Sequence, residues 1–319
     1  MKIGYHSSHE QFAPSLLLAL AEEAQDAGFQ AIKSSDHFHP WSDQNSQSGF
    51  AWSWLGAAMA RTHVPFGTIT APGYRYHPAI VAQAIATLAE MFPNRFWAAL
   101  GTGQAINEAM TGLQWPEKSE RNTRLLECVD IIRRLLAGET VTHRGRVTVI
   151  EAKLYSRPSS IPPLLGAAVT PETARVAAGW ADGLLTTGGE LDSVRKVVDA
   201  FREAGGEGKP VMVQDAVSWA PTEDEAFEQA IEQWSGSTVG GEVNWDIRRP
   251  ADFDLIARMV GREEIAETVA VSPDLNQHAE RIAAYASLGV DSVYLHNVGA
   301  NQREFIEAFG SKVLPQLRA

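Results

Sequence analysis

The stretch PFGTITAPGYRYHPAIVAQAIATLAEMFPNRFWAALGTG (65–103) decides the fold class. Its two ends, PFGTITAP and RFWAALGTG, are short and largely apolar, as expected for strands that are buried on both faces. Between them, HPAIVAQAIATLAEMF (77–92) repeats apolar residues at helical spacing. A strand, a helix and a second strand in this order predict a βαβ unit with parallel strands.

The same alternation continues on both sides of this stretch. Further strand-like segments, each followed by a helix-like one, lie at 2–8, 31–38, 162–169, 182–188, 210–220 and 291–298. Eight such units predict an α/β fold, specifically a closed (β/α)8 TIM barrel that forms a single domain over 1–319. A doubly wound parallel sheet is the alternative.

Two segments interrupt the alternation. Residues 139–161 alternate in polarity around Arg144-Gly145, which predicts a surface hairpin insertion. Residues 235–290 are too long for one connection from a helix to a strand, so we expect a lid insertion there, between strands 7 and 8.

The composition narrows the classes of partner. The 319 residues include 27 Lys and Arg against 39 Asp and Glu, a net charge of −12, and Cys128 is the single cysteine. An acidic chain without basic clusters is a poor ligand for nucleic acid or anionic membranes, and one cysteine excludes an intrachain disulfide framework. We find no signal peptide and no apolar run of about 18 residues. We therefore expect a cytoplasmic protein that binds a small molecule.

Active sites of (β/α)8 barrels lie at the carboxyl ends of the strands. Packing does not require the pair Asp36-His37 beside Pro40-Trp41 at the end of the second strand. We therefore predict that His37 is a general base held by Asp36. The alternative is that His37 only caps a neighbouring backbone group.

Two other chemistries are less well supported by the residues. His6, Asp36, His37 and His39 could converge at the mouth, but their spacing is not diagnostic of a metal site, and we predict no metal. The glycines of GTG (101–103) lack the remainder of a dinucleotide or P-loop motif. They indicate close approach of a ligand to the backbone.

Four blocks of sequence carry a resemblance to a known family. SDHFHPW (35–41), YRYHPA (74–79), GTGQAINE (101–108) and WPE (115–117) resemble the luciferase-like flavin and deazaflavin oxidoreductases, and the nearest branch is the F420-dependent glucose-6-phosphate dehydrogenases. The likeness covers essentially the whole chain. It implies a luciferase-like barrel, a homodimer formed through the helices near 52–63 and 77–92, and coenzyme F420 or FMN as cofactor.

The resemblance also implies roles for individual residues. The catalytic residues would be His37, which removes a hydroxyl proton, Trp41, which steadies the ring, and Gln104 beside the ring. The residues implied to bind the cofactor are Ser35, Asp36, Thr68, Ile69, Thr70, Gly103, Asn107, Ala168, Val169, Thr170 and Thr187. The residues assigned to the substrate are His6, Trp245 and His296. A cis peptide bond or a bulge is implied near Ile69.

The departures from that branch concern proton transfer and the substrate. Gln104 stands where the branch has glutamate, and an amide cannot give or take a proton at neutral pH. The three basic residues that hold the sugar phosphate in the branch fall on Glu190, Asn244 and Thr268. Each lost charge-assisted contact is worth about 1.5–3 kcal/mol, so we expect a substrate without phosphate.

The chemistry implied is hydride transfer between the ring and a non-phosphorylated alcohol, sugar or carbonyl compound. Three alternatives stay open: a reduced-FMN-dependent monooxygenase, a metal-dependent barrel hydrolase built on the histidines, and a binding module without turnover.

Overall fold

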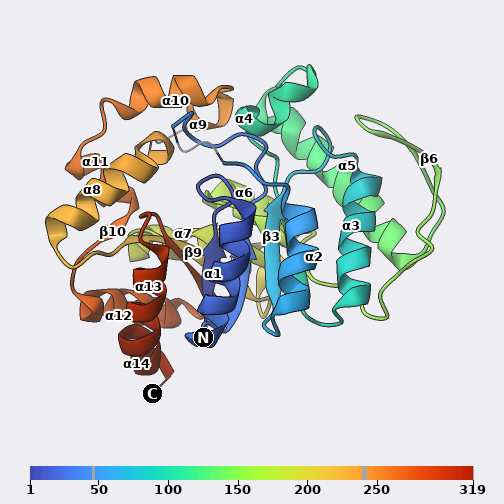
Figure 1. Cartoon of the computed structure of the whole chain (residues 1–319). Coiled ribbons are helices and arrows are strands. Elements are labelled where there is room, and N and C mark those ends of the chain that lie inside the picture. The colour runs from blue at the N-terminus through green and yellow to red at the C-terminus, as the bar shows by residue number, and fades with distance from the viewer. Residues whose placement is uncertain (45–46, 239–242, 319) are drawn as a thin grey trace.

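The protein is described by a computed structural model that covers residues 1–44, 47–238 and 243–318 (Figure 1). Its core is a closed ring of eight parallel strands, in which each strand pairs with the next and β11 pairs with β1. In chain order these strands are β1 Lys2–Ser7, β2 Ala31–Ser34, β3 Phe66–Thr70, β4 Phe96–Leu100, β7 Leu164–Ala167, β8 Gly183–Thr187, β9 Val211–Ser218 and β11 Ser292–Asn297. The predicted (β/α)8 barrel is confirmed.

The predicted helices near 52–63 and 77–92 are confirmed within a layer of helices that surround the barrel. The helices of this layer are α1 Pro14–Asp26, α2 Ala51–Arg61, α3 Pro78–Met91, α5 Lys118–Ala137, α6 Pro171–Ala178, α7 Leu191–Phe201, α8 Glu223–Trp234, α12 Leu275–Ala284, α13 Gln302–Ala308 and α14 Leu314–Arg318. Helix α3 shows why: His77 caps its first turn, Pro78 supplies a preset φ, and Val81, Ile85 and Leu88 are buried on one face.

Two aromatic rings fill the lower part of the barrel. The indole Nε1 of Trp97 donates a hydrogen bond to the Tyr294 hydroxyl at 3.2 Å. Glycines on neighbouring strands make room for these rings, because a Cβ on Gly67 would lie 1.9 Å from the Trp97 ring and one on Gly4 would lie 2.5 Å from the Tyr294 ring. A packed floor of this kind leaves the carboxyl ends of the strands for polar residues.

The interruptions of the alternation have their own structures. Strands β5 Val141–Arg144 and β6 Thr148–Ala152 form an antiparallel hairpin around Arg144-Gly145. After α8 come α9 Val243–Asp246, α10 Pro250–Ala257, α11 Arg262–Thr268 and the short strand β10 Ala270–Val271. Helix α9 contacts the short helix α4 Ala105–Glu108, and both lie on the same side of the barrel as α10 (Figure 1). Helix α12, which is also within 235–290, instead packs beside the barrel against α14.

Two expectations are wrong. Strand β2 ends at Ser34 and does not continue to residue 38, because the residues that follow turn into the hydrogen-bonded loop described below. Every peptide bond in the described residues is trans, and β3 pairs with β4 in unbroken register through Ile69, so the cis bond or bulge expected there is absent. Within the same residues, no helix is long and apolar enough to span a bilayer.

Candidate active site

The loop after β2 places His37 at the barrel mouth. Its Nδ1 lies 3.3 Å from the carbonyl oxygen of His39. A carbonyl can only accept, so Nδ1 carries the proton and Nε2 keeps its lone pair. Burial lowers the pKa of His37, and the charge of Glu10 only partly opposes this. His37 is therefore a neutral imidazole near pH 7, with a proton-accepting nitrogen that bonds no described residue.

Trp41 packs beside this imidazole. The two ring centroids are 5.1 Å apart, and the far side of the indole meets Trp234 and Phe253. The indole Nε1 is buried and has no hydrogen-bond partner among the described residues. A buried, unpaired donor in a native structure calls for a partner, and next to a base a ligand oxygen would be one.

Asp36 does not hold the His37 ring, contrary to the prediction. Its Oδ2 accepts from the Thr70 hydroxyl at 2.7 Å, and its Oδ1 accepts from the Tyr76 hydroxyl at 2.9 Å. Asp36 and Thr70 do meet as expected, but they bind each other. The carboxylate therefore fixes the backbone from which His37 projects, and the His39 carbonyl orients the ring.

A buried arginine connects this loop to α4, and sequence reasoning missed it. The Arg75 Nη2 donates to the Asp36 carbonyl oxygen at 2.8 Å and lies 3.5 Å from Asp36 Oδ1. On its other side, Glu108 accepts from the Arg75 backbone N–H at 2.8 Å, and its Oε1 lies 3.7 Å from Nε. Burial raises the pKa of Glu108 to about 7 despite this arginine. Both residues belong to the quoted blocks YRYHPA and GTGQAINE, which is the signal that could have found them.

Hydrogen bonds of Asn107 and His39 hold the loop against α4. The Asn107 Oδ1 accepts from the backbone N–H groups of Phe38 and His39, at 2.9 and 3.3 Å. The His39 Nδ1 lies 2.7 Å from the Ile106 carbonyl oxygen. The amide oxygen of Asn107 is thus already used, and a cofactor contact by this residue stays a prediction.

Ser35 and Glu10 form a buried pair next to His37. The Ser35 hydroxyl accepts from the His9 backbone N–H at 2.9 Å and donates to a Glu10 carboxylate oxygen. Burial alone raises the pKa of Glu10, but the charge of His37 and the hydrogen bond from Ser35 outweigh it and lower that pKa. Glu10, which the sequence did not single out, therefore places a buried negative charge near the base.

The interior below the mouth brings together two of the three predicted substrate residues. The rings of His6 and His296 are 4.6 Å apart, and both side chains are buried. Burial lowers the pKa of His6 well below its ordinary value and that of His296 to about 4, so both are neutral near pH 7. The third predicted residue, Trp245, is half-buried in α9.

The opposite side of the mouth is lined by small or partly exposed residues. Ile69, Ala167 and Met212 pack against the interior aromatic cluster yet remain partly exposed. Gly103 has a φ of 82°, a backbone conformation that favours glycine, and Gln104 beside it is half-buried. Ile69 and Ala167 lie at or next to the carboxyl ends of β3 and β7, whereas Met212 is the second residue of β9.

Some of the residues implied to bind the cofactor are buried or already hydrogen-bonded within the protein. Thr68 is fully buried, and among the described residues its hydroxyl bonds only with Ser34, at 3.1 and 3.3 Å. Thr170 caps α6, where its hydroxyl accepts from the Thr173 N–H at 3.3 Å. Ala168 is buried, and Val169 and Thr187 are exposed at the ends of β7 and β8.

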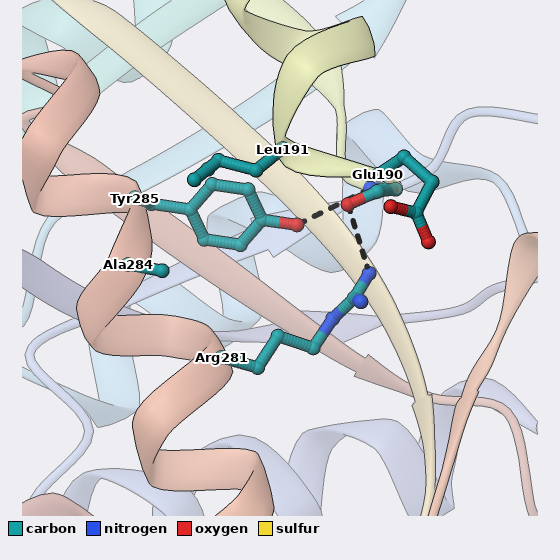
Figure 2. Close-up of a pocket in the computed structure, with 6 residues that line it drawn as sticks. Glu190, Leu191, Arg281, Ala284 and Tyr285 are labelled. Carbon is teal, nitrogen blue, oxygen red and sulfur yellow. Dashed lines mark hydrogen bonds between the residues drawn. The ribbon is translucent and has the colours of Figure 1, made fainter.

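A cavity of about 180 Å³ lies where α7 begins beside α12 (Figure 2). In Figure 2, Arg281 and the Tyr285 hydroxyl both hydrogen-bond to the backbone of Gly189, at 3.3 and 3.2 Å. The Arg281 guanidinium is also bound to the buried Asp215 at 2.9 Å, and Glu190 adds a carboxylate to the lining. With its one cation neutralised, this cavity is poorly suited to a phosphate.

The described residues hold no group of three or more His, Cys, Asp or Glu side chains placed to bind a metal ion. The fold and the mouth together define a (β/α)8 barrel with a neutral histidine beside an indole N–H that has no partner among the described residues.

Comparison with known proteins agrees with this class. Residues 1–292 match the family described as luciferase-like monooxygenase. The F420-dependent glucose-6-phosphate dehydrogenase of Microbacterium testaceum is 36% identical over 329 residues, covering 100% of this chain and 98% of that protein. The enzyme of the same name from Mycobacterium tuberculosis H37Rv is 33% identical over 331 residues, with coverages of 100% and 98%. The chain therefore belongs to the luciferase-like monooxygenase family, as its motifs indicated.

A solved structure is similar over the whole chain. An F420-dependent secondary alcohol dehydrogenase in complex with an F420–acetone adduct superposes with a TM-score of 0.92 at 32% identity, covering 100% of this chain and 99% of that one. The luciferase-like form of the barrel is thereby confirmed.

Proposed function

We propose that this protein transfers a hydride between coenzyme F420 or FMN and a non-phosphorylated alcohol, sugar or carbonyl substrate. The observation that carries the proposal is His37, a neutral imidazole at the mouth of a luciferase-like barrel whose Nε2 bonds none of the described residues. The names of the relatives, F420-dependent dehydrogenases of a sugar phosphate and of a secondary alcohol, support F420 over FMN.

Each residue has a definite part in this reaction. A deazaflavin or flavin ring, when bound, would supply the acceptor for the hydride of the carbinol carbon. His37 Nε2 takes the hydroxyl proton, and the imidazole becomes a cation. A secondary alcohol is thereby converted to a ketone, and a cyclic sugar to a lactone. Glu10, buried nearby, stabilises that cation. Trp41 Nε1 donates to the substrate oxygen, and Gln104 contacts the ring without transferring a proton.

The absence of phosphate from the substrate is supported by the three positions that depart from the sugar-phosphate branch. Glu190 presents a carboxylate, and the Thr268 hydroxyl donates to Ile265 within its own helix at 3.4 Å. Asn244 lies in α9 and is uncharged. Nearby Arg249 is held by Asp252 at 2.6 Å.

Turnover of glucose and glucose 6-phosphate with F420 tests this specificity. We expect the wild type to show no preference for the phosphorylated sugar. Replacing Glu190 with lysine is expected to raise kcat/KM for glucose 6-phosphate about 10-fold or more, because one charge-assisted contact is restored. Glu207→Lys, the same charge change at another exposed position, is the control. A wild-type preference for glucose 6-phosphate that Glu190→Lys leaves unchanged would contradict the proposal.

Two further properties stay predictions of the same proposal. A cytoplasmic homodimer would bury the exposed apolar side chains of Ile80 and Met91 on α3, which are 55% and 53% exposed.

Oxygen consumption by the protein with reduced FMN would favour the monooxygenase alternative over hydride transfer.

A further inference from the structure

Lys33 is a lysine buried inside the barrel. It is 1% exposed, and its register neighbours are His6 on β1 and Gly67 on β3. Its side chain crosses the barrel interior to β9, where Nζ donates to Gln214 Oε1 at 2.5 Å. Nζ also lies 3.5 Å from His6 Nδ1. In the part of the chain that the structure describes, no carboxylate oxygen lies within 4.0 Å of this ammonium.

Lys33 determines which way the Gln214 amide points. Protonated Lys33 has donors and no acceptor, so in that form the amide oxygen faces Lys33 and the NH2 group faces away from it. That NH2 group makes no hydrogen bond within the described ranges, and Gln214 is partly exposed. Met212 and Ala216, which share its face of β9, are also partly exposed. Gln214 therefore has two donors, on a partly exposed side chain, that bond no described residue.

The surroundings leave the charge of Lys33 incompletely balanced. Burial lowers its pKa to about 7, and the negative charge of Glu10 opposes this without cancelling it. The other titratable groups that face it are His6 from β1 and His296 from β11, and burial keeps both neutral near pH 7. A buried ammonium with this little compensation favours an added negative charge.

We propose that Lys33 is a positioning residue that holds Gln214 as a hydrogen-bond donor for a negatively polarised oxygen of the bound small molecule. This part of the mouth then selects a ligand with a carbonyl, carboxylate or enolate oxygen. The inference rests on the proposed function, and the oxygen belongs either to the substrate or to the cofactor ring.

Binding measurements on two variants test the proposal. Gln214→Glu keeps an acceptor for Lys33, and therefore the fold, but presents an oxygen where the NH2 group was. Lys33→Met removes the charge and leaves Gln214 free to turn. The control is Lys196→Met on the exposed face of α7. The probes are F420 and FMN, followed by their fluorescence, and acetone and acetate, followed by ligand-observed NMR with the cofactor-loaded protein.

We expect Gln214→Glu to weaken at least one probe about 10-fold or more, as the loss of a charge-assisted donor does. Loss of F420 or FMN binding assigns the oxygen to the ring, and loss confined to acetone or acetate assigns it to the substrate. Affinities of folded Gln214→Glu within twofold of the wild type for every probe would overturn the inference. The Gln214→Glu affinities decide the question even if Lys33→Met fails to fold.

The pH profile separates positioning from a merely structural role. Because protonated Lys33 favours a negative oxygen, wild-type affinity for the affected probe should fall as the pH rises through about 7. Lys33→Met should lack this fall. A variant that is weaker at every pH but keeps the wild-type slope would contradict the inference. If the wild type binds neither F420 nor FMN, the proposed function fails as well, whereas binding that the variants leave unchanged removes this inference alone.

Discussion

Replacing His37 with alanine is expected to lower kcat/KM for alcohol oxidation by about 100- to 10,000-fold, the range typical for loss of a general base. The reason is geometric: the His39 carbonyl holds the Nδ1 proton, so Nε2 alone can take the hydroxyl proton. Steady-state kinetics under anaerobic conditions measure the effect.

Three observations make this result specific to a base. His63→Ala, at an exposed position, should leave kcat/KM unchanged. The wild-type pH profile should rise through a pKa below 6.5, since burial lowers the pKa of His37. Added imidazole should restore part of the activity of His37→Ala. Retention of most of the turnover by this variant would contradict the assignment.

Replacing Arg75 with methionine is expected to lower the free energy of unfolding by about 3–5 kcal/mol, because two buried carboxylates lose their shared cation. Asp36 and Glu108 lie 3.5 and 3.7 Å from the guanidinium, and both are almost fully buried. Urea denaturation followed by circular dichroism measures the loss.

Arg61→Met is the matched control, because Arg61 pairs with Glu22 at 2.7 Å on the surface and such pairs contribute about 0–1 kcal/mol. The loss caused by Arg75→Met should be smaller at pH 5.5 than at pH 8, since Glu108, with a pKa near 7, is neutral at the lower pH. Adding Glu108→Gln to Arg75→Met should recover part of the stability. Equal small losses at both arginines would show that the buried network contributes little.

The fold could be predicted from the sequence almost completely. Short apolar runs predict strands that are buried on both faces, as in 96–100, because they are too short for a helix. Helical spacing with clear ends predicts a helix, as in α3 with His77 and Pro78. The end of β2 was predicted four residues late because SDHF looks extended in sequence. In the structure, the bonds of Asp36 to Thr70 and Tyr76 turn the chain there.

The site was predictable only in part, for a physical reason. Position at a strand end indicated His37, Asp36, His6 and His296, all of which reach the mouth or the interior below it. Lys33 and Gln214 are separated by 181 residues and meet only because the barrel closes, so no local pattern indicates them. The direction of the Asp36 carboxylate likewise depends on Tyr76, a side chain from the next loop.

The central claim is that the mouth binds a deazaflavin or flavin ring and passes a hydride to or from it. Anaerobic titration of F420 and FMN into the same protein preparation, followed by addition of a secondary alcohol, tests this claim most directly. The account predicts saturable binding of at least one cofactor, F420 in the first place, and loss of its oxidised absorbance when the alcohol is added. Binding of neither cofactor, by a protein that unfolds cooperatively, would contradict it.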